Sequence, residues 1–173
     1  MEEIKNRKTT RLQGFDYNRS GAFFLTVCTE NRRCVLSNVV GTGVPDGPSI
    51  ELLPYGKIAE KYIKQLDAFY DDVSVRSYVI MPNHIHLLLS VMKDNGRGNP
   101  SPTVDTAMGW LKYQITKEIN ILRGTPGEKL LQRSFFDHII RNQDDYYEIY
   151  KYIYENPLRW KLDKFYAEEW KHH

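Results

Sequence analysis

Hydrophobic and polar positions along the chain follow two periods, one typical of strands and one typical of helices. Runs rich in aromatic and β-branched residues predict strands over 23–29, 73–82, 83–92 and 133–142. Apolar residues spaced three and four apart predict helices over 54–70, 103–122 and 143–157. The predicted order is therefore strand, helix, strand, strand, helix, strand, helix.

This order predicts an α+β fold with a ferredoxin-like (RRM-like) antiparallel sheet, β-α-β-β-α-β, followed by an additional C-terminal helix. A chain of 173 residues fits one domain, so a single domain over 1–173 is expected. The stretch 37–56 carries several Gly and Pro turn signals around two short apolar runs, which predicts a surface excursion or hairpin. Within it, 41–48 looks like an insertion.

The helical periodicity also predicts which side chains face the core. Asn142 is expected to cap the last helix, and Pro157 is expected to end it. The expected core-facing positions are Ile58, Tyr62, Ile63, Leu66 and Phe69, then Met108, Leu111, Ile115, Ile119 and Leu122, and finally Tyr146, Ile149, Tyr150 and Ile153.

Composition narrows the class of protein. Apolar residues make up 41% and charged residues 27%, a balance typical of soluble globular proteins, and no apolar stretch is long enough to span a bilayer. The polar N-terminus lacks the apolar segment of a signal peptide, and Cys28 and Cys34 are too few for a disulfide framework. A cytoplasmic protein with reduced thiols is therefore expected. The net charge of +2 is too small to indicate nucleic-acid binding by itself.

The segment "MPNHIHLLLS" places two histidines in an otherwise apolar strand. Side chains alternate along a strand, so His84 and His86 share one face, about 7 Å apart along the strand. The apolar residues between and after them belong under the helices, which leaves both histidines on the opposite, open face of the sheet. They are either half-exposed structural residues or part of a metal site, and a metal ion requires further ligands.

The C-terminal helix offers two such side chains. Tyr152 and Asn156 lie one turn apart and away from the expected core stripe, with Glu148 on the same side of the helix. Periodicity alone does not distinguish a functional Tyr152 from one of the other half-exposed tyrosines among the chain's 12.

Taken together, "YVIMPNHIHLLLSV" and the later "DYYEIYKYIYENPLRW" resemble the single-tyrosine HUH transposases, in particular the REP-associated tyrosine transposases. The segments "GAFFLTVCTENRR", "PYGKI" and "FFDHIIRNQDDY" fit the same order, and the resemblance spans about Thr10 to Trp160. It implies that His84 and His86 bind a metal, that Tyr152 is the nucleophile and that Asn156 is the third ligand. Many members of the wider family carry Gln at the place of Asn156.

The family's reaction, by resemblance, is cleavage and rejoining of single-stranded DNA through a 5′-phosphotyrosine. The resemblance implies Mg²⁺ or Mn²⁺ as cofactor and hairpin ends of a mobile or repeat element as partner. It does not decide whether the chain forms a homodimer. Glu148 is a candidate general base. Basic side chains are expected to follow the DNA backbone: Arg7, Lys8, Arg11, Arg32, Arg33, Lys112, Lys117 and Arg123.

Two other functions fit parts of the sequence. The same sheet could bind single-stranded nucleic acid without cutting it, either as an RRM-like module or as a domesticated transposase, and EDTA would then leave the affinity unchanged. A small zinc hydrolase using His84 and His86 ranks last, because no third His, Asp or Glu stands at metal-ligand spacing.

Overall fold

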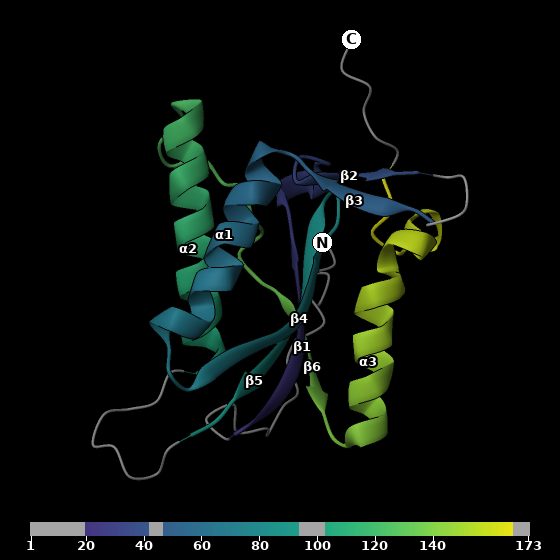
Figure 1. Ribbon diagram of the computed structural model, residues 1–173. Helices are drawn as coiled ribbons and strands as arrows, with labels where there is room; N and C mark the ends of the chain where they lie inside the picture. Colours follow the sequence, from purple (N-terminus) through teal and green to yellow (C-terminus); the bar gives the residue numbers. More distant parts are fainter. Residues whose placement is uncertain (1–19, 42–46, 94–102, 168–173) are drawn as a thin grey trace, which may run out of the picture.

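The computed structural model describes residues 20–41, 47–93 and 103–167. Figure 1 shows a central sheet with two helices on one side and one helix on the other. The elements, in chain order, are β1 (Gly21–Cys28), the 3-10 helix η1 (Glu30–Arg32), β2 (Ser37–Val40), β3 (Ser49–Leu52), α1 (Pro54–Phe69), β4 (Val73–Ile80), β5 (His84–Val91), α2 (Val104–Arg123), β6 (Phe136–Ile140), α3 (Gln143–Glu155) and the 3-10 helix η2 (Asn156–Leu162).

The main sheet has the strand order β4-β5-β1-β6, and all neighbours are antiparallel. This order, with α1 and α2 as crossovers, is that of a ferredoxin-like fold, so the fold predicted from the sequence is confirmed. The register of β1 against β5 places Thr26 opposite His86 and Cys28 opposite His84. The histidines therefore lie on one of the two central strands of the sheet, directly opposite residues of the other.

Alternation along β5 divides its side chains between two cores. Ile85, Leu87 and Leu89 pack in the larger core, together with buried residues of α1 and α2. Leu88 points to the other face and packs with Ile153 of α3 in a smaller core. This division leaves the histidines on the face that α3 covers.

Each of the three predicted apolar stripes includes one residue that is exposed in the structure. Leu122 is 61% exposed in the last turn of α2, where Ile119 and Asn120 form the buried side instead. Tyr150 is 46% exposed, because the side of α3 facing the sheet is centred on Ile149 and Ile153. Phe69, the last residue of α1, is also largely exposed.

The predicted hairpin and helix ends agree with the structure. The strands β2 and β3 pair as a two-stranded sheet, and residues 42–46 of the proposed insertion lie outside the described residues. The Asn142 side chain accepts a hydrogen bond from the Asp145 backbone N–H at 2.8 Å and caps α3, which ends before Pro157. No helix in the described part of the chain is long and apolar enough to cross a bilayer.

Candidate metal and nucleophile site

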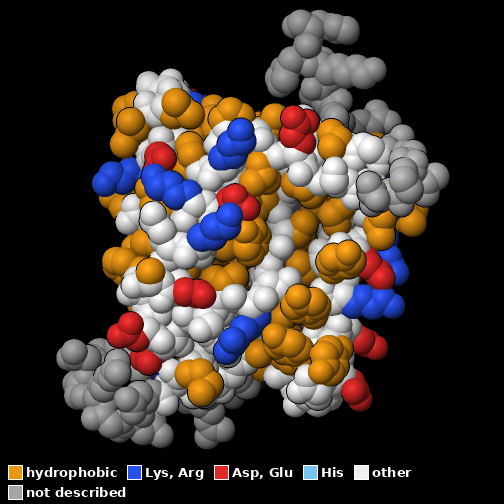
Figure 2. Space-filling view, viewed as in Figure 1, with side chains coloured by type: hydrophobic (Ala, Val, Ile, Leu, Met, Phe, Trp, Pro, Cys, Tyr) orange, Lys and Arg blue, Asp and Glu red, His pale blue; other side chains and the backbone are white. Residues whose placement is uncertain are grey.

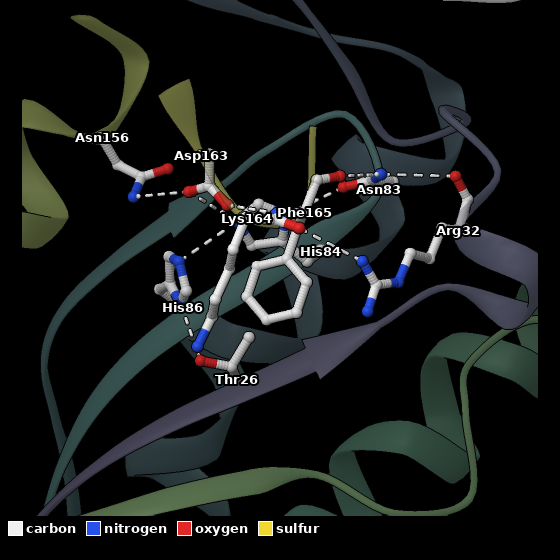
Figure 3. A network of polar contacts seen from close by, with 9 residues as sticks. All are labelled: Thr26, Arg32, Asn83, His84, His86, Asn156, Asp163, Lys164 and Phe165. Atoms are coloured by element: carbon white, nitrogen blue, oxygen red, sulfur yellow. Dashed lines mark hydrogen bonds and ion pairs between the residues drawn. The ribbon is translucent and has the colours of Figure 1, made fainter. Parts of the chain in front are cut away.

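The two histidines of β5 face each other. Their Nε2 atoms are 3.1 Å apart and their ring centroids 4.5 Å apart, so the Nε2 atoms of the two imidazoles point toward each other (Figure 3). The prediction that they share a face is confirmed. The prediction of an open face is wrong: His84 is 0% and His86 1% exposed, because α3 and the segment after it cover this side of the sheet.

Asn83 determines which nitrogen of His84 carries a hydrogen. Its Nδ2 donates to the carbonyl of Phe165 at 2.8 Å and to that of Arg32 at 3.3 Å, so its Oδ1 faces His84 Nδ1, at 2.9 Å. An amide oxygen accepts only, and His84 Nδ1 must therefore donate. The Nε2 of a neutral His84 is then left with a free lone pair, the form that binds a metal.

His86 can exist in either tautomer. Its Nδ1 lies 2.8 Å from Thr26 Oγ1, and a hydroxyl both donates and accepts. Without a cation, Nε2–H of His86 donates to Nε2 of His84 while Thr26 donates to Nδ1. In the other tautomer the ring proton of His86 is on Nδ1 instead of Nε2 and is donated to the Thr26 hydroxyl, which has rotated to accept it, so that both Nε2 lone pairs are available to a metal ion.

Burial keeps both imidazoles neutral. It lowers the pKa of His84 to about 4, partly opposed by the nearby Asp163 carboxylate. Burial also lowers the pKa of His86 well below its usual value, and the neighbouring His84 lowers it further. Neutral histidine is the form that coordinates metal ions, so at neutral pH an ion can bind without a net loss of a proton from either ring.

A carboxylate that the sequence analysis did not identify completes this cluster. Asp163 follows η2, its side chain is 3% exposed, and its Oδ2 lies 3.9 Å from His84 Nε2. One ligand atom from each of His84, His86 and Asp163 falls within 4.8 Å of the others. Asp163 stands 11 positions after Tyr152 in a stretch without helical or strand periodicity, so no pattern marked it.

Asn156, the expected third ligand, lies at the same place. It is 1% exposed, and its Nδ2 donates to Asp163 Oδ2 at 3.3 Å. Its Oδ1 is buried and makes no hydrogen bond. A buried acceptor without a partner is costly, and a bound cation would satisfy it. Two imidazoles and one amide oxygen, with a carboxylate close by, fit a divalent ion such as Mn²⁺ or Mg²⁺.

Tyr152 lies beside the histidine pair. Its ring centroid is 5.3 Å from that of His86 and 5.8 Å from that of Phe24. Burial raises the pKa of its hydroxyl, and the Asp163 carboxylate raises it further, while a hydrogen bond from Asn156 acts in the opposite direction. The phenol is therefore held protonated, and its activation requires positive charge nearby or a base.

The remaining predicted site residues are placed differently. Glu148 is exposed on α3, whereas the polar side chains at the Tyr152 hydroxyl are Asn156 and Asp163. Arg32 lies near the site: it donates to the carbonyl of Lys164 at 3.3 Å and stacks over the Phe165 ring at 5.0 Å. The neighbouring Arg33 donates to the carbonyl of Lys129 at 3.4 Å.

The three basic residues predicted on α2 lie on the opposite side of the sheet from the histidines (Figure 1). Lys112 donates to the carbonyl of Arg133, Lys117 lies over the Tyr113 ring, and Arg123 pairs with Glu128 at 2.6 Å. A DNA strand that contacts both Tyr152 and these basic residues would have to pass around the edge of the sheet. Arg7, Lys8 and Arg11 lie outside the described residues.

The outer side of α3 carries several exposed tyrosines. Figure 2 shows orange side chains gathered over this helix, and Tyr147, Tyr150 and Tyr154 are 63%, 46% and 79% exposed. His138 of β6 contacts Asp145 of α3 at 2.9 Å and so links the strand to the start of the helix.

No protein-family model matches the chain. An uncharacterised protein of Haemophilus influenzae is 24% identical over an alignment of 180 positions, which covers 95% of this chain and 96% of that protein. The REP-associated tyrosine transposase of Escherichia coli is 24% identical over 145 residues, 83% of this chain and 70% of the relative. A solved REP-associated tyrosine transposase bound to a REP hairpin superposes with a TM-score of 0.52 at 20% identity, covering 88% and 86% of the two chains. The resemblance identified from the sequence is thus confirmed.

Proposed function

We propose that this chain is a metal-dependent transposase that cuts and rejoins single-stranded DNA through Tyr152. The observation that carries the proposal is the contact of the Tyr152 ring with His86, which places one phenol beside two imidazoles whose Nε2 atoms converge. A packing role would require neither the convergence nor the buried acceptor of Asn156. We further propose that residues 1–173 form one cytoplasmic domain of this kind.

In the proposed reaction the Tyr152 oxygen attacks the phosphorus of the scissile phosphodiester. The new O–P bond forms as the bond to the 3′ oxygen breaks, the phenol proton leaves to a base, and the departing 3′ oxygen takes up a proton. The products are a 5′-phosphotyrosine and a free 3′-hydroxyl. A second 3′-hydroxyl can reverse the step on another strand, because the phosphotyrosine bond retains the energy needed for joining.

His84, His86 and Asn156 would hold a divalent ion, Mg²⁺ or Mn²⁺. The ion would supply positive charge at the scissile phosphate, where negative charge develops. Thr26 and Asn83 orient the two imidazoles, and the site excludes water from both rings. For the proton of Tyr152, Asp163 is better placed than the predicted Glu148, because Glu148 is exposed whereas the Asp163 carboxylate is near enough to raise the pKa of the phenol.

The proposed substrate is a single strand that carries a hairpin. A solved structure of similar fold is bound to a REP hairpin, which supports this class of DNA for the present chain. Arg32 and Arg33 remain the proposed backbone contacts closest to the site. For Lys112, Lys117 and Arg123 we propose at most a contact with a distant part of the hairpin, because α2 lies behind the sheet.

The test uses hairpin oligonucleotides labelled at the 3′ end and incubated with the protein and Mn²⁺. The 3′ fragment should migrate with the protein on a denaturing gel, because its 5′ phosphate is then bound to Tyr152. The variant Tyr152→Phe should yield no adduct. Tyr154→Phe, on the exposed side of the same helix, is the matched control and should yield as much adduct as the unchanged protein.

The position of Asp163 also makes the zinc hydrolase hypothesis more plausible than the sequence did, since a carboxylate lies close to His84 and His86. The same assay separates the two functions. A hydrolase uses water as nucleophile and releases both fragments, so cleavage without any adduct, persisting in Tyr152→Phe, would favour it. Hairpin binding that is unaffected by EDTA, without cleavage, would favour a binding module.

A further inference from the structure

The segment after α3 folds back over the histidines and brings Asp163 with it (Figure 3). Trp160 and Phe165 on either side of Asp163 lie with ring centroids 5.9 Å and 4.8 Å from that of His84. The Phe165 carbonyl accepts a hydrogen bond from Asn83, the residue that orients His84. This segment is therefore part of the wall of the site.

The position of the Asp163 carboxylate is fixed by its own segment. Oδ1 accepts from the Phe165 backbone N–H at 2.7 Å, and Oδ2 accepts from Asn156 Nδ2 at 3.3 Å. Oδ2 then faces His84 Nε2 at 3.9 Å, too far for a hydrogen bond. Since Asn83 leaves that nitrogen as an acceptor, two acceptors face each other across this distance.

Acceptors thus outnumber donors at this point. The Nε2 of His84, the Oδ2 of Asp163 and the Oδ1 of Asn156 are all buried. One hydrogen of His86 and one of Asn156 Nδ2 face the first two, and the Oδ1 of Asn156 has no partner. Buried acceptors that have too few donors are unfavourable unless a cation lies among them. A separation of 3.9 Å is close to the distance between two ligands of one ion, whose bonds are each about 2 Å long.

We propose that Asp163 is a direct protein ligand of the divalent ion at His84 and His86, and that ion binding stabilises the segment 156–165 in its position over the site. The proposal rests on the metal site of the proposed function and adds a carboxylate to its ligands. A carboxylate adds negative charge to a donor set that is otherwise neutral, and two imidazoles with a carboxylate favour Mn²⁺ over Mg²⁺.

The test is a Mn²⁺ titration of the metal-free full-length protein without DNA, followed by the electron paramagnetic resonance signal of free Mn²⁺. The variant Asp163→Asn keeps the shape of the side chain and removes its charge. It should bind Mn²⁺ at least about tenfold more weakly than the unchanged protein. Asp144→Asn, an exposed carboxylate in the first turn of α3, is the matched control and should bind like the unchanged protein.

Hydrogen exchange supplies a second readout that does not depend on activity. Mn²⁺ should slow exchange of the Phe165 amide and its neighbours in the unchanged protein, and should have no such effect in Asp163→Asn. An affinity within about twofold of the unchanged protein in Asp163→Asn, together with loss of binding in His84→Ala, would overturn the proposal and leave the metal site intact. Conversely, Mn²⁺ binding that depends on Asp163 without any DNA adduct would overturn the proposed function and leave this inference standing.

Discussion

The ring of Tyr152 lies against the imidazole of His86, with centroids 5.3 Å apart and planes inclined by 61°. The two residues come from different layers, Tyr152 from α3 and His86 from a central strand of the sheet. Their contact depends on how α3 is held on the sheet, by Ile149 and Ile153 and by the contact between His138 and Asp145. The nucleophile and the metal site are thus joined by packing, and each can be tested separately.

The hydroxyl of Thr26 is expected to control metal affinity through His86. The variant Thr26→Val keeps the shape of the buried side chain but removes the partner of His86 Nδ1. Loss of such an orienting hydrogen bond weakens metal binding by about 10- to 100-fold. A Mn²⁺ titration measures the effect, and Thr116→Val on α2, behind the sheet, should leave the affinity unchanged. Equal affinities in the two variants would refute the orienting role of Thr26.

The stability of the metal-free protein should fall between about pH 7 and pH 5. An unfolded histidine has a pKa of about 6.5, whereas burial lowers the pKa of His84 to about 4 and also lowers that of His86. The unfolded chain therefore binds protons first as the pH falls, and the free energy of unfolding decreases with it. The stabilising contribution of the neutral pair is fully present above the unfolded pKa.

Urea denaturation in EDTA at the two pH values measures this difference. The variant His86→Gln removes one of the two groups, so its loss of stability on acidification should be smaller than that of the unchanged protein. An unfolding free energy that stays constant or rises toward about pH 5 contradicts the burial of two neutral imidazoles.

Two glycines in helices should respond in opposite ways to substitution by alanine. A Cβ on Gly56 of α1 would overlap the backbone carbonyl of Leu36, which cannot move as a flexible side chain would. Gly56→Ala should therefore destabilise the protein by more than about 2 kcal/mol. A Cβ on Gly109 of α2 meets nothing within 4 Å, so Gly109→Ala should stabilise it by about 0.5–1 kcal/mol. Thermal or urea unfolding of both variants checks the pair, and a loss of stability in Gly109→Ala would show that α2 is packed differently.

The arrangement of the strands and the pairing of the histidines were predictable because both follow from local periodicity. Alternation along β5 places Ile85, Leu87 and Leu89 in one core and the histidines on the other face, and this does not depend on the rest of the sequence. Likewise, the position of Tyr152 off the main stripe of α3 follows from the helical repeat.

The closure of the site was not predictable in this way. Asp163 and Phe165 follow a 3-10 helix. The position of Phe165 depends on contacts with Asn83 and Arg32, which are far away in the sequence, and Asp163 in turn accepts from the Phe165 backbone N–H. Local periodicity carries no information about such contacts, so the histidines were expected on an open face. The predicted apolar stripes also failed in the last turns of α1 and α2, where Phe69 and Leu122 continue the helical period but are exposed.

The central claim is that Tyr152 becomes covalently attached to DNA. Trypsin cuts after Lys151 and Arg159 and releases residues 152–159, which contain both Tyr152 and Tyr154. After reaction with a hairpin oligonucleotide and Mn²⁺ and digestion of the DNA, tandem mass spectrometry of this peptide locates the remaining nucleotide. The account predicts a 5′-phosphonucleotide on Tyr152. A nucleotide on Tyr154 or on another peptide, or cleaved DNA with an unmodified peptide, would contradict it.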